Sequence, residues 1–298
     1  MNAQLQDLVT QALSGEAEPF QRLVEALRSA AADNVAVLLE SALSPEEILR
    51  RAATQAARER SEPEVLQAMA ALARDADADV RKGLARSLGA APSWLPDDLV
   101  GLLLRDVEAE VRFYAAQGAR GRTALEVALV AGLSRDDDEQ VRLSIARSLA
   151  SANPAVALPA LLAALAQDDN RPVAEACAGS IESHLDRLNG YPETYARPRL
   201  AVLENAQQRL AAVGPERYPR LTAWLADRVA HDVDPERLRN FGTLLTEDAA
   251  AGRLPRAHEV NSTCTVVKQA LFGKPPRAAV LHRRLGMTAA QSHSAASN

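Results

Sequence analysis

Aromatic residues are scarce in this chain of 298 residues: they make up 3% of the sequence, whereas hydrophobic residues make up 47%. The apolar residues are mostly Ala, Leu and Val, and Gly is also infrequent, at 14 residues. Ala and Leu favour helices, and runs of β-branched and aromatic residues typical of strands are missing. A core of small aliphatic side chains suits closely packed helices. The composition therefore predicts an all-α fold and excludes a β-rich one.

Cysteine is nearly absent as well. The two cysteines, Cys177 and Cys264, do not form a CxxC pair, which excludes a disulfide framework and a zinc module. This usage fits a reducing compartment. The first twenty residues lack the basic and apolar regions of a signal peptide, so we expect a cytoplasmic protein.

No long uninterrupted apolar run is present either. Residues 148–167 carry no charge, but Pro154 and Pro159 interrupt them and their continuous apolar part is about half of the roughly 20 residues that a membrane span needs. We expect a buried helix there and no membrane span.

Motifs for catalysis and metal binding are also missing. The sequence has no GxSxG elbow, no HExxH and no glycine-rich phosphate loop. His258 and Glu259 form its one His-Glu dipeptide, which cannot supply a metal site alone, and Cys177 occupies a repeat position expected in the core. We therefore expect no enzyme activity and no catalytic, metal or cofactor site.

A repeat with a period of about 30 residues is the main feature that the sequence does contain. Residues 74–89 read RDADADVRKGLARSLG, and residues 135–150 read RDDDEQVRLSIARSLA. An apolar residue recurs at intervals of 32, 31, 30 and 32 residues, at Ile48, Val80, Val111, Val141 and Val173. A helix pair of this length cannot bury its apolar face alone, so each pair must stack on its neighbours.

Acidic turns between the helix pairs carry a second regularity. An aspartate lies six residues before an arginine in three pairs of residues: Asp75 and Arg81, Asp106 and Arg112, and Asp136 and Arg142. A guanidinium offers five fixed donors to carboxylate or carbonyl oxygens, so these residues are expected to bridge adjacent repeats. The pattern fails at Asp168, because the residue six positions later is Ala174 and not an arginine. It also fails in the unit at residues 33–61, where Leu43 and Leu49 stand in place of the aspartate and the arginine.

The turn aspartate, the Val-Arg dipeptide six positions later and the following Ala and Leu resemble HEAT repeats of the short bacterial kind related to phycobilin lyase subunits. The resemblance covers residues 62–186, with a weaker unit at 33–61. It implies a right-handed α-solenoid of helix pairs and says little about function, because such arrays serve several functions.

The repeats divide the chain into four regions. Residues 1–32 are expected to be capping helices, 33–186 the HEAT-like repeats, 187–286 a divergent helical C-terminal region, and 287–298 a disordered tail. Pro215 and Pro235 are expected to begin helices, since proline is tolerated in a first turn.

Charge is distributed unevenly along the chain. Residues 1–186 hold 18 Lys and Arg against 29 Asp and Glu, a net charge of −11, whereas residues 187–298 hold 16 against 10, a net charge of +6. The basic C-terminal segment offers four candidate residues for an anionic partner: Lys274, Arg277, Arg283 and Arg284. Docking of this segment on the acidic repeats of its own or a sister chain is an equal alternative.

These features together favour a non-catalytic scaffold or adaptor that binds a protein partner. Polar positions on the second helices of the repeats are the further candidates for partner binding: Asp97, Asp98, Arg105, Arg122 and Glu126. Two alternatives stay open. One is a nucleic-acid-binding protein that uses the basic C-terminal segment, and the other is a lyase-like subunit that acts with a partner on a protein-bound chromophore or modification.

Overall fold

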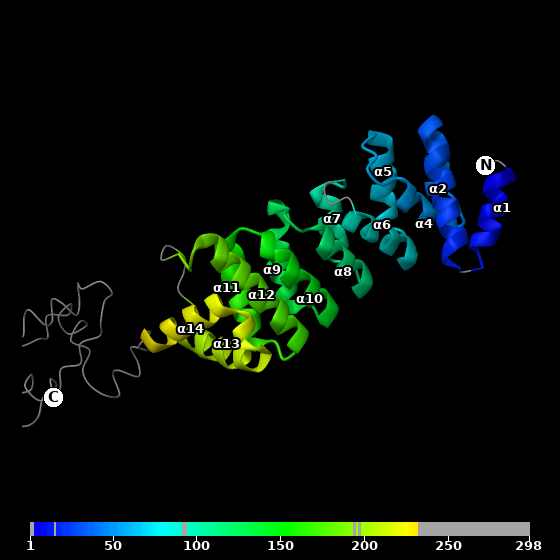
Figure 1. Cartoon of the computed structure of the whole chain (residues 1–298). Helices are drawn as coiled ribbons and strands as arrows, with labels where there is room; N and C mark the ends of the chain where they lie inside the picture. Colours follow the sequence, from blue (N-terminus) through cyan, green and yellow to red (C-terminus); the bar gives the residue numbers. More distant parts are fainter. Residues whose placement is uncertain (1–2, 15, 91–93, 193–194, 196–197, 232–298) are drawn as a thin grey trace, which may run out of the picture. The chain divides into compact units, whose positions relative to one another are not determined.

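A computed structural model of the chain describes residues 3–14, 16–90, 94–192, 195 and 198–231 (Figure 1). All regular secondary structure within these residues is helical, as the composition predicts. The chain divides into two compact units, residues 1–198 with 205–222 and residues 199–204 with 223–298. In the second unit, residues 200–204 and 223–231 belong to helices.

The helices of the first unit follow one another in pairs, and short turns connect them. Their bounds are α1 Ala3–Ala12, α2 Ala17–Asp33, α3 Val35–Ala42, α4 Glu47–Ala56, α5 Pro63–Leu72, α6 Ala78–Ala90, α7 Asp97–Leu103, α8 Ala109–Gly118, α9 Glu126–Arg135, α10 Glu139–Ser148, α11 Pro154–Gln167 and α12 Arg171–Leu188. Short 3₁₀ turns, η1 Thr123–Leu125 and η2 Leu149–Ser151, precede α9 and α11. The remaining elements are α13 Leu200–Val213, η3 Pro215–Arg217 and α14 Pro219–His231.

Helix starts follow from local sequence. Asn and Asp side chains cap several helices by accepting hydrogen bonds from first-turn N–H groups, and Asp138 accepts from both Gln140 and Val141 at the start of α10. Proline occupies the first turn of α5, α11 and α12, where its missing N–H costs nothing. Pro215 differs from the prediction: it opens the 3₁₀ turn η3, and α14 begins at Pro219. Pro235 lies outside the described residues.

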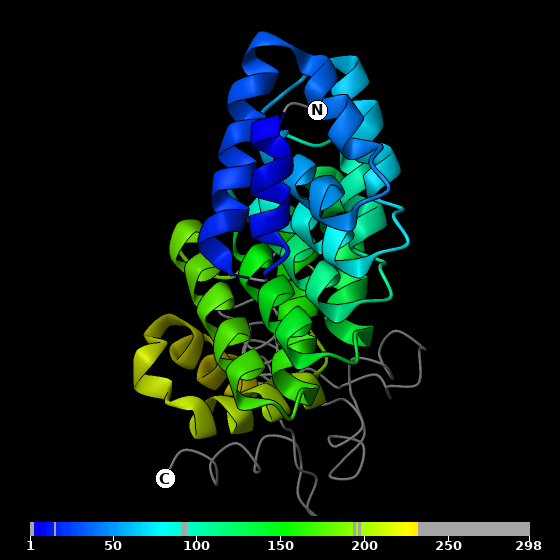
Figure 2. The same ribbon diagram turned by 90° about the vertical axis from the view of Figure 1, so that its right-hand side faces the viewer.

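The even-numbered helices of the first unit form a continuous layer. In chain order, each of α2, α4, α6, α8, α10 and α12 packs against the next (Figures 1 and 2). Odd-numbered helices form a second layer, in which α3 packs against α5 and α9 against α11. Small aliphatic side chains fill the space between the layers, and Leu84, Leu88 and Leu129 are among the most deeply buried.

In the α3–α4 pair, the repeat register differs by one residue from the predicted register. Val80, Val111, Val141 and Val173 are all buried, and each precedes the same position of the repeat. The equivalent residue of α4 is Leu49 rather than Ile48, because Arg50 occupies the position of Arg81. Both Ile48 and Leu49 are buried, so apolar periodicity alone cannot distinguish them.

Residues 205–222 belong to the first unit and make several polar contacts with α12 and the turn before it. Glu182 on α12 accepts hydrogen bonds from the N–H groups of Arg220 (3.0 Å) and Leu221 (2.8 Å), and so caps α14. Arg209 on α13 forms an ion pair with Asp169. Among the described residues, no helix combines the length and apolar character that crossing a bilayer requires.

Candidate functional site

One edge of the even-numbered layer is held by an arginine in the first turn of α4, α6, α8 and α10. Arg81 donates from Nη1 to the carbonyl oxygen of Asp75 (2.8 Å), in the turn before its helix. Its Nε and Nη2 donate to the two carboxylate oxygens of Asp106 (2.7 and 3.0 Å), in the turn after the pair. A single guanidinium thus joins two consecutive inter-pair turns.

This arrangement recurs in four helices, and we call it the Asp–Arg ladder. Its bidentate pairs are Arg50 with Asp75, Arg81 with Asp106, Arg112 with Asp136, and Arg142 with Asp168, each with a shortest distance of 2.7 Å. The ladder residues are largely buried, and the aspartate side chains are only 8 to 9% exposed. The predicted ladder residues are therefore structural, and they bridge neighbouring helix pairs.

The pairing within the ladder corrects three details of the sequence interpretation. The aspartate six residues before each arginine supplies a backbone carbonyl, whereas the carboxylate comes from the following turn. Arg50 extends the ladder to the α3–α4 pair, where it donates to the carbonyl of Ser44 instead of an aspartate carbonyl. Asp168 belongs to the ladder too, as the acceptor of Arg142, and the ladder ends because Ala174 offers no guanidinium.

Two carboxylates of the ladder, those of Asp75 and Asp106, have a pKa below the ordinary value. Burial acts to raise the pKa of Asp75, but hydrogen bonds from Arg50 and from the N–H of Asp77 bring that pKa below its ordinary value. The pKa of Asp106 is lowered in the same way, against its burial, by Arg81 and the N–H of Glu108. Acid conditions will therefore act against the ladder.

Hydroxyl groups hold the carbonyls near the opposite ends of the even-numbered helices. Ser148 on α10 donates to the carbonyl of Ala116 on α8 (2.8 Å), and Ser180 on α12 donates to that of Ala146 on α10 (2.8 Å). Ser87 on α6 donates to the carbonyl of Thr54 on α4 (3.2 Å). All three serines are buried, so they satisfy backbone acceptors away from water.

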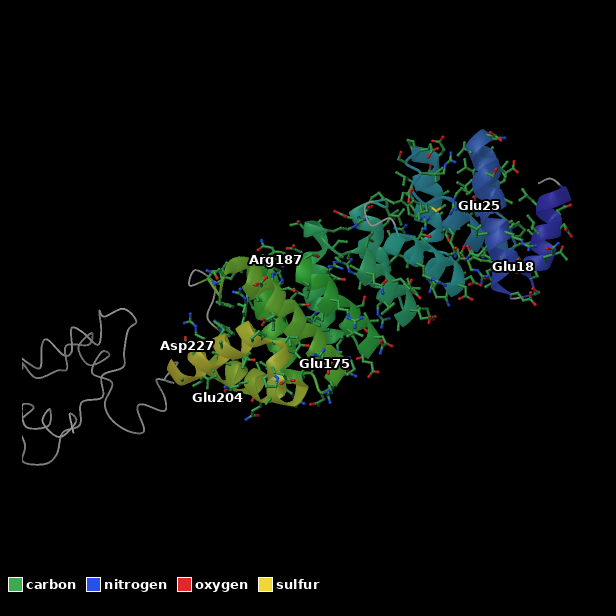
Figure 3. All side chains as sticks on the ribbon, viewed as in Figure 1. Glu18, Glu25, Glu175, Arg187, Glu204 and Asp227 are labelled. Carbon is green, nitrogen blue, oxygen red and sulfur yellow. The ribbon has the colours of Figure 1, made fainter. Side chains whose placement is uncertain are left out.

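His184 on α12 contacts the turn that follows α10. Its Nε2 lies 2.8 Å from the carbonyl oxygen of Leu149, and Nη2 of Arg187, labelled in Figure 3, lies 2.9 Å from its Nδ1. A neutral ring satisfies both contacts, with Nε2–H donating and Nδ1 accepting. Burial lowers the pKa of His184 and so favours this neutral form.

Cys177 is fully buried in α12, as expected for a core residue. Burial raises the pKa of its thiol, which disfavours the thiolate needed by a nucleophile or a metal ligand. Cys264, His258 and Glu259 lie outside the described residues.

Two of the candidate partner-binding residues are structural instead. Arg122 donates to the carbonyl of Leu95 (2.7 Å) and to the carboxylate of Asp97 (2.6 Å), and its side chain is 11% exposed. Glu126 is buried and accepts a hydrogen bond from the N–H of Asn153 (2.7 Å). Both side chains join neighbouring helix pairs, a structural role that the sequence interpretation did not assign to them.

The other candidates differ in their positions. Asp97 is exposed but paired with Arg122, while Asp98 and Arg105 are exposed to solvent. The basic candidates of the C-terminal segment lie outside the described residues: Lys274, Arg277, Arg283 and Arg284.

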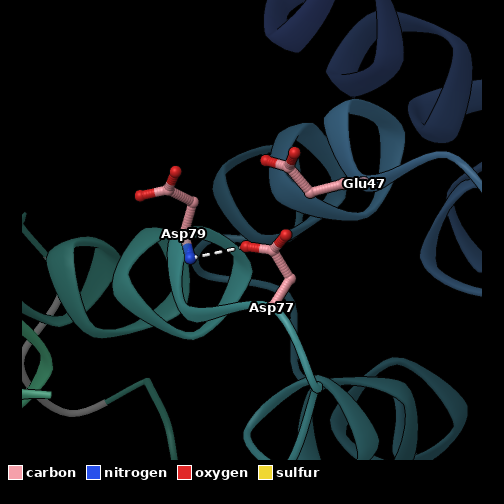
Figure 4. A group of neighbouring side chains, drawn as sticks. All are labelled: Glu47, Asp77 and Asp79. Atoms are coloured by element: carbon pink, nitrogen blue, oxygen red, sulfur yellow. Dashed lines mark hydrogen bonds between the residues drawn. The ribbon is translucent and has the colours of Figure 1, made fainter.

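A group of three carboxylates lies between the starts of α4 and α6 (Figure 4). Glu47, Asp77 and Asp79 each place one oxygen within 4.8 Å of the others, a spacing that a cation could use. Asp77 caps α6 by accepting from the N–H of Asp79 (2.8 Å). Lys82 Nζ lies 2.6 Å from Asp79, and a guanidinium nitrogen of Arg51 lies 3.6 Å from Glu47. Capping and these two cations account for the group.

Sequence reasoning missed an exposed face on α6, α8 and α10. Arg86, Gln117 and Arg147 each lie five residues after a ladder arginine, so they form a row across three adjacent helices, and all three are exposed. Phe113 and Tyr114 are half-buried beside Gln117, with ring centroids 5.1 Å apart. The guanidinium carbon of Arg86 lies 5.4 Å from the Tyr114 centroid. The spacing of 31 and 30 residues between the three row positions was the signal for this face.

Comparison with protein-family models and with curated protein sequences found no match for this chain.

Proposed function

We propose that this chain is a non-catalytic scaffold or adaptor that binds a protein partner, built as a right-handed α-solenoid of HEAT-like helix pairs. The observation that carries the proposal is the recurrence of one exposed position, every 30 or 31 residues, on adjacent helices of the first unit. Such a surface presents side chains at a fixed spacing, which suits an extended peptide or a partner helix.

The use of polar side chains in the first unit supports this proposal. The ladder aspartates and arginines form hydrogen bonds between neighbouring helix pairs, and Arg122, Glu126 and His184 do the same. These bonds restrain the positions of successive helices relative to each other. A restrained row of helices loses little conformational entropy when a partner binds, which favours recognition.

Affinity purification followed by reconstitution tests the proposal. The tagged full chain would be isolated from its native cells with and without nuclease, and each protein recovered in stoichiometric amount would be produced separately and mixed with the pure chain. We expect at least one such protein to form a nuclease-resistant complex that co-elutes in size-exclusion chromatography. Recovery of nuclease-sensitive nucleic acid alone, or of no protein that reconstitutes, would overturn the proposal.

A further inference from the structure

We infer that the exposed face formed by Arg86, Phe113, Tyr114, Gln117 and Arg147 is the docking surface for a short acidic peptide segment of a protein partner. We call it the arginine–aromatic face. The inference rests on the proposed function and adds to it a location and a chemical class of partner. It also moves the candidate surface from the odd-numbered helices, where sequence reasoning had placed it, to the even-numbered layer.

Two arginines of this face lack an acidic partner. Within the part of the chain that the structure describes, neither Arg86 nor Arg147 takes part in an ion pair, whereas Arg81, Arg112 and Arg142 on the same helices are all held by aspartates. An exposed guanidinium is available for bidentate bonds to a carboxylate. The face therefore offers two fixed positions for acidic side chains.

An aromatic pair lies between these two cations. Phe113 and Tyr114 stand edge to face, at an interplanar angle of 81°, and both remain half-buried in a chain with few aromatic residues. Tyrosine and arginine are enriched among the residues that dominate binding energy at protein interfaces. Contact with Tyr114 also restrains Arg86, which lowers the entropy lost on binding.

Spacing of the two arginines defines the segment that fits. Helices packed side by side lie about 8–10 Å apart, so two helix spacings separate Arg86 and Arg147 by roughly 16–20 Å. An extended chain rises about 3.3 Å per residue, so it covers this distance in about five or six residues. The matching segment has two acidic residues at this separation and an apolar residue between them.

A nucleic-acid backbone fits this face less well. Binding of nucleic acid depends on many cations that neutralise successive phosphates. Here the uncharged Gln117 separates the two arginines of the row. Two exposed carboxylates, Glu110 and Glu139, lie in the first turns of α8 and α10, at the same ends of these helices as the ladder. A long polyanion lying across these helices would be repelled by the acidic turns, whereas a short acidic segment avoids them.

Selection from a displayed random peptide library on the immobilised full chain tests the inference. We expect the enriched peptides to be acidic, with an apolar residue between acidic positions. A fluorescein-labelled copy of the most enriched peptide would then be titrated with the chain and with Arg86→Glu/Arg147→Glu, and a labelled oligothymidylate would be titrated in parallel. Loss of two charged contacts should weaken peptide binding at least about tenfold. Tyr114→Ala should weaken it as well.

The matched control is Arg74→Glu/Arg135→Glu, which makes the same charge change at two exposed arginines outside this face. It should leave the affinity for the peptide within about twofold, and circular dichroism should show that both double variants keep the helical content of the parent chain. Acidic peptides that bind equally well to both double variants would overturn the inference, as would enriched peptides without acidic residues. In either case the proposed function would stand, with another surface as its site. Preferential binding of the oligothymidylate at this face, with no enriched peptide, would overturn both.

Discussion

Gly118 of α8 lies against Leu88 of α6 so closely that a β-carbon on residue 118 would stand 2.4 Å from Cβ of Leu88. The near atom belongs to the stem of a buried side chain, which cannot rotate away. This close approach is possible only because residue 118 has no side chain, and it fixes the separation of two adjacent helices.

Gly118→Ala is therefore expected to destabilise the chain, although alanine favours helix by about 0.5–1 kcal/mol over glycine. Overpacking of this kind costs about 1–3 kcal/mol, which outweighs that gain. The midpoint of urea unfolding should fall. Gly101→Ala is the control, because its nearest contact would be Leu125 Cδ2 at 3.5 Å, and its midpoint should stay or rise. Equal shifts in the two variants would contradict the close packing at Gly118.

Arg112→Lys should remove most of the stabilisation that this member of the Asp–Arg ladder provides. Lysine keeps the charge, but it cannot donate simultaneously to both carboxylate oxygens of Asp136 and to the carbonyls of the preceding turn. We expect a loss of about 2 kcal/mol in the free energy of unfolding, because hydrogen bonds to a poorly solvated carboxylate are lost. Arg22→Lys is the control: Arg22 forms an exposed ion pair with Glu18, and this change should alter the free energy of unfolding by less than about 0.5 kcal/mol. A similar small effect in both variants would show that the ladder adds little.

His184 should make stability fall as pH falls below its unfolded pKa of about 6.5. Burial lowers the pKa of His184 in the folded state and outweighs the hydrogen bond to the Leu149 carbonyl, which raises it; Arg187 lowers the pKa further and Glu126 raises it. The unfolded chain therefore binds a proton first as pH falls, so the free energy of unfolding decreases by up to about 1.4 kcal/mol per pH unit below 6.5.

His184→Gln keeps an N–H donor for the Leu149 carbonyl but cannot titrate. In this variant, the free energy of unfolding, measured by urea unfolding at several pH values, should decrease less than in the parent chain as the pH falls below about 6.5. The loss of stability at lower pH that comes from protonation of Asp75 and Asp106 should remain. An unchanged pH profile would indicate that His184 keeps an ordinary pKa.

Glu182→Ala should loosen the first turn of α14 without unfolding α12. The Glu182 carboxylate accepts from the N–H groups of Arg220 and Leu221, and removal of such a cap costs about 1 kcal/mol. Hydrogen exchange of peptides that contain these two amides should accelerate severalfold. Ser183→Ala, at the exposed neighbouring residue, is the control, and acceleration of the same size there would argue against the cap.

The sequence predicted the helical class, the period and six of the eight ladder residues, all but Arg50 and Asp168, because each depends on local propensity or on spacing. It paired each arginine with the aspartate six residues earlier, without distinguishing a carbonyl acceptor from a carboxylate acceptor. Asp75 is near Arg81 along the chain, whereas Asp106 comes near it in space only after a complete helix pair has folded. Sequence distance could not rank these two partners.

Orientation of polar residues on the odd-numbered helices was equally hard to predict. Arg122 and Glu126 flank a short 3₁₀ turn, η1, that precedes α9 and interrupts the regular helical period. Their burial depends on backbone groups of Leu95 and Asn153 in neighbouring pairs, which no local pattern reveals. Spacing in the sequence placed Arg86 and Arg147 at equivalent positions of the repeat, but only the packing of the helices showed that both are exposed.

The ladder also makes the length of this protein adjustable in whole units. Removal of residues 81–111 would place Arg112 six residues after Asp75 in the shortened chain, the separation that Arg81 has now, and would leave the Arg112 pairing with Asp136 unchanged. Duplication of the same segment would add one helix pair with both of its bonds. Recombination between repeats can therefore lengthen or shorten the array while preserving every joint, which gives evolution and protein engineering a simple way to vary the number of binding positions.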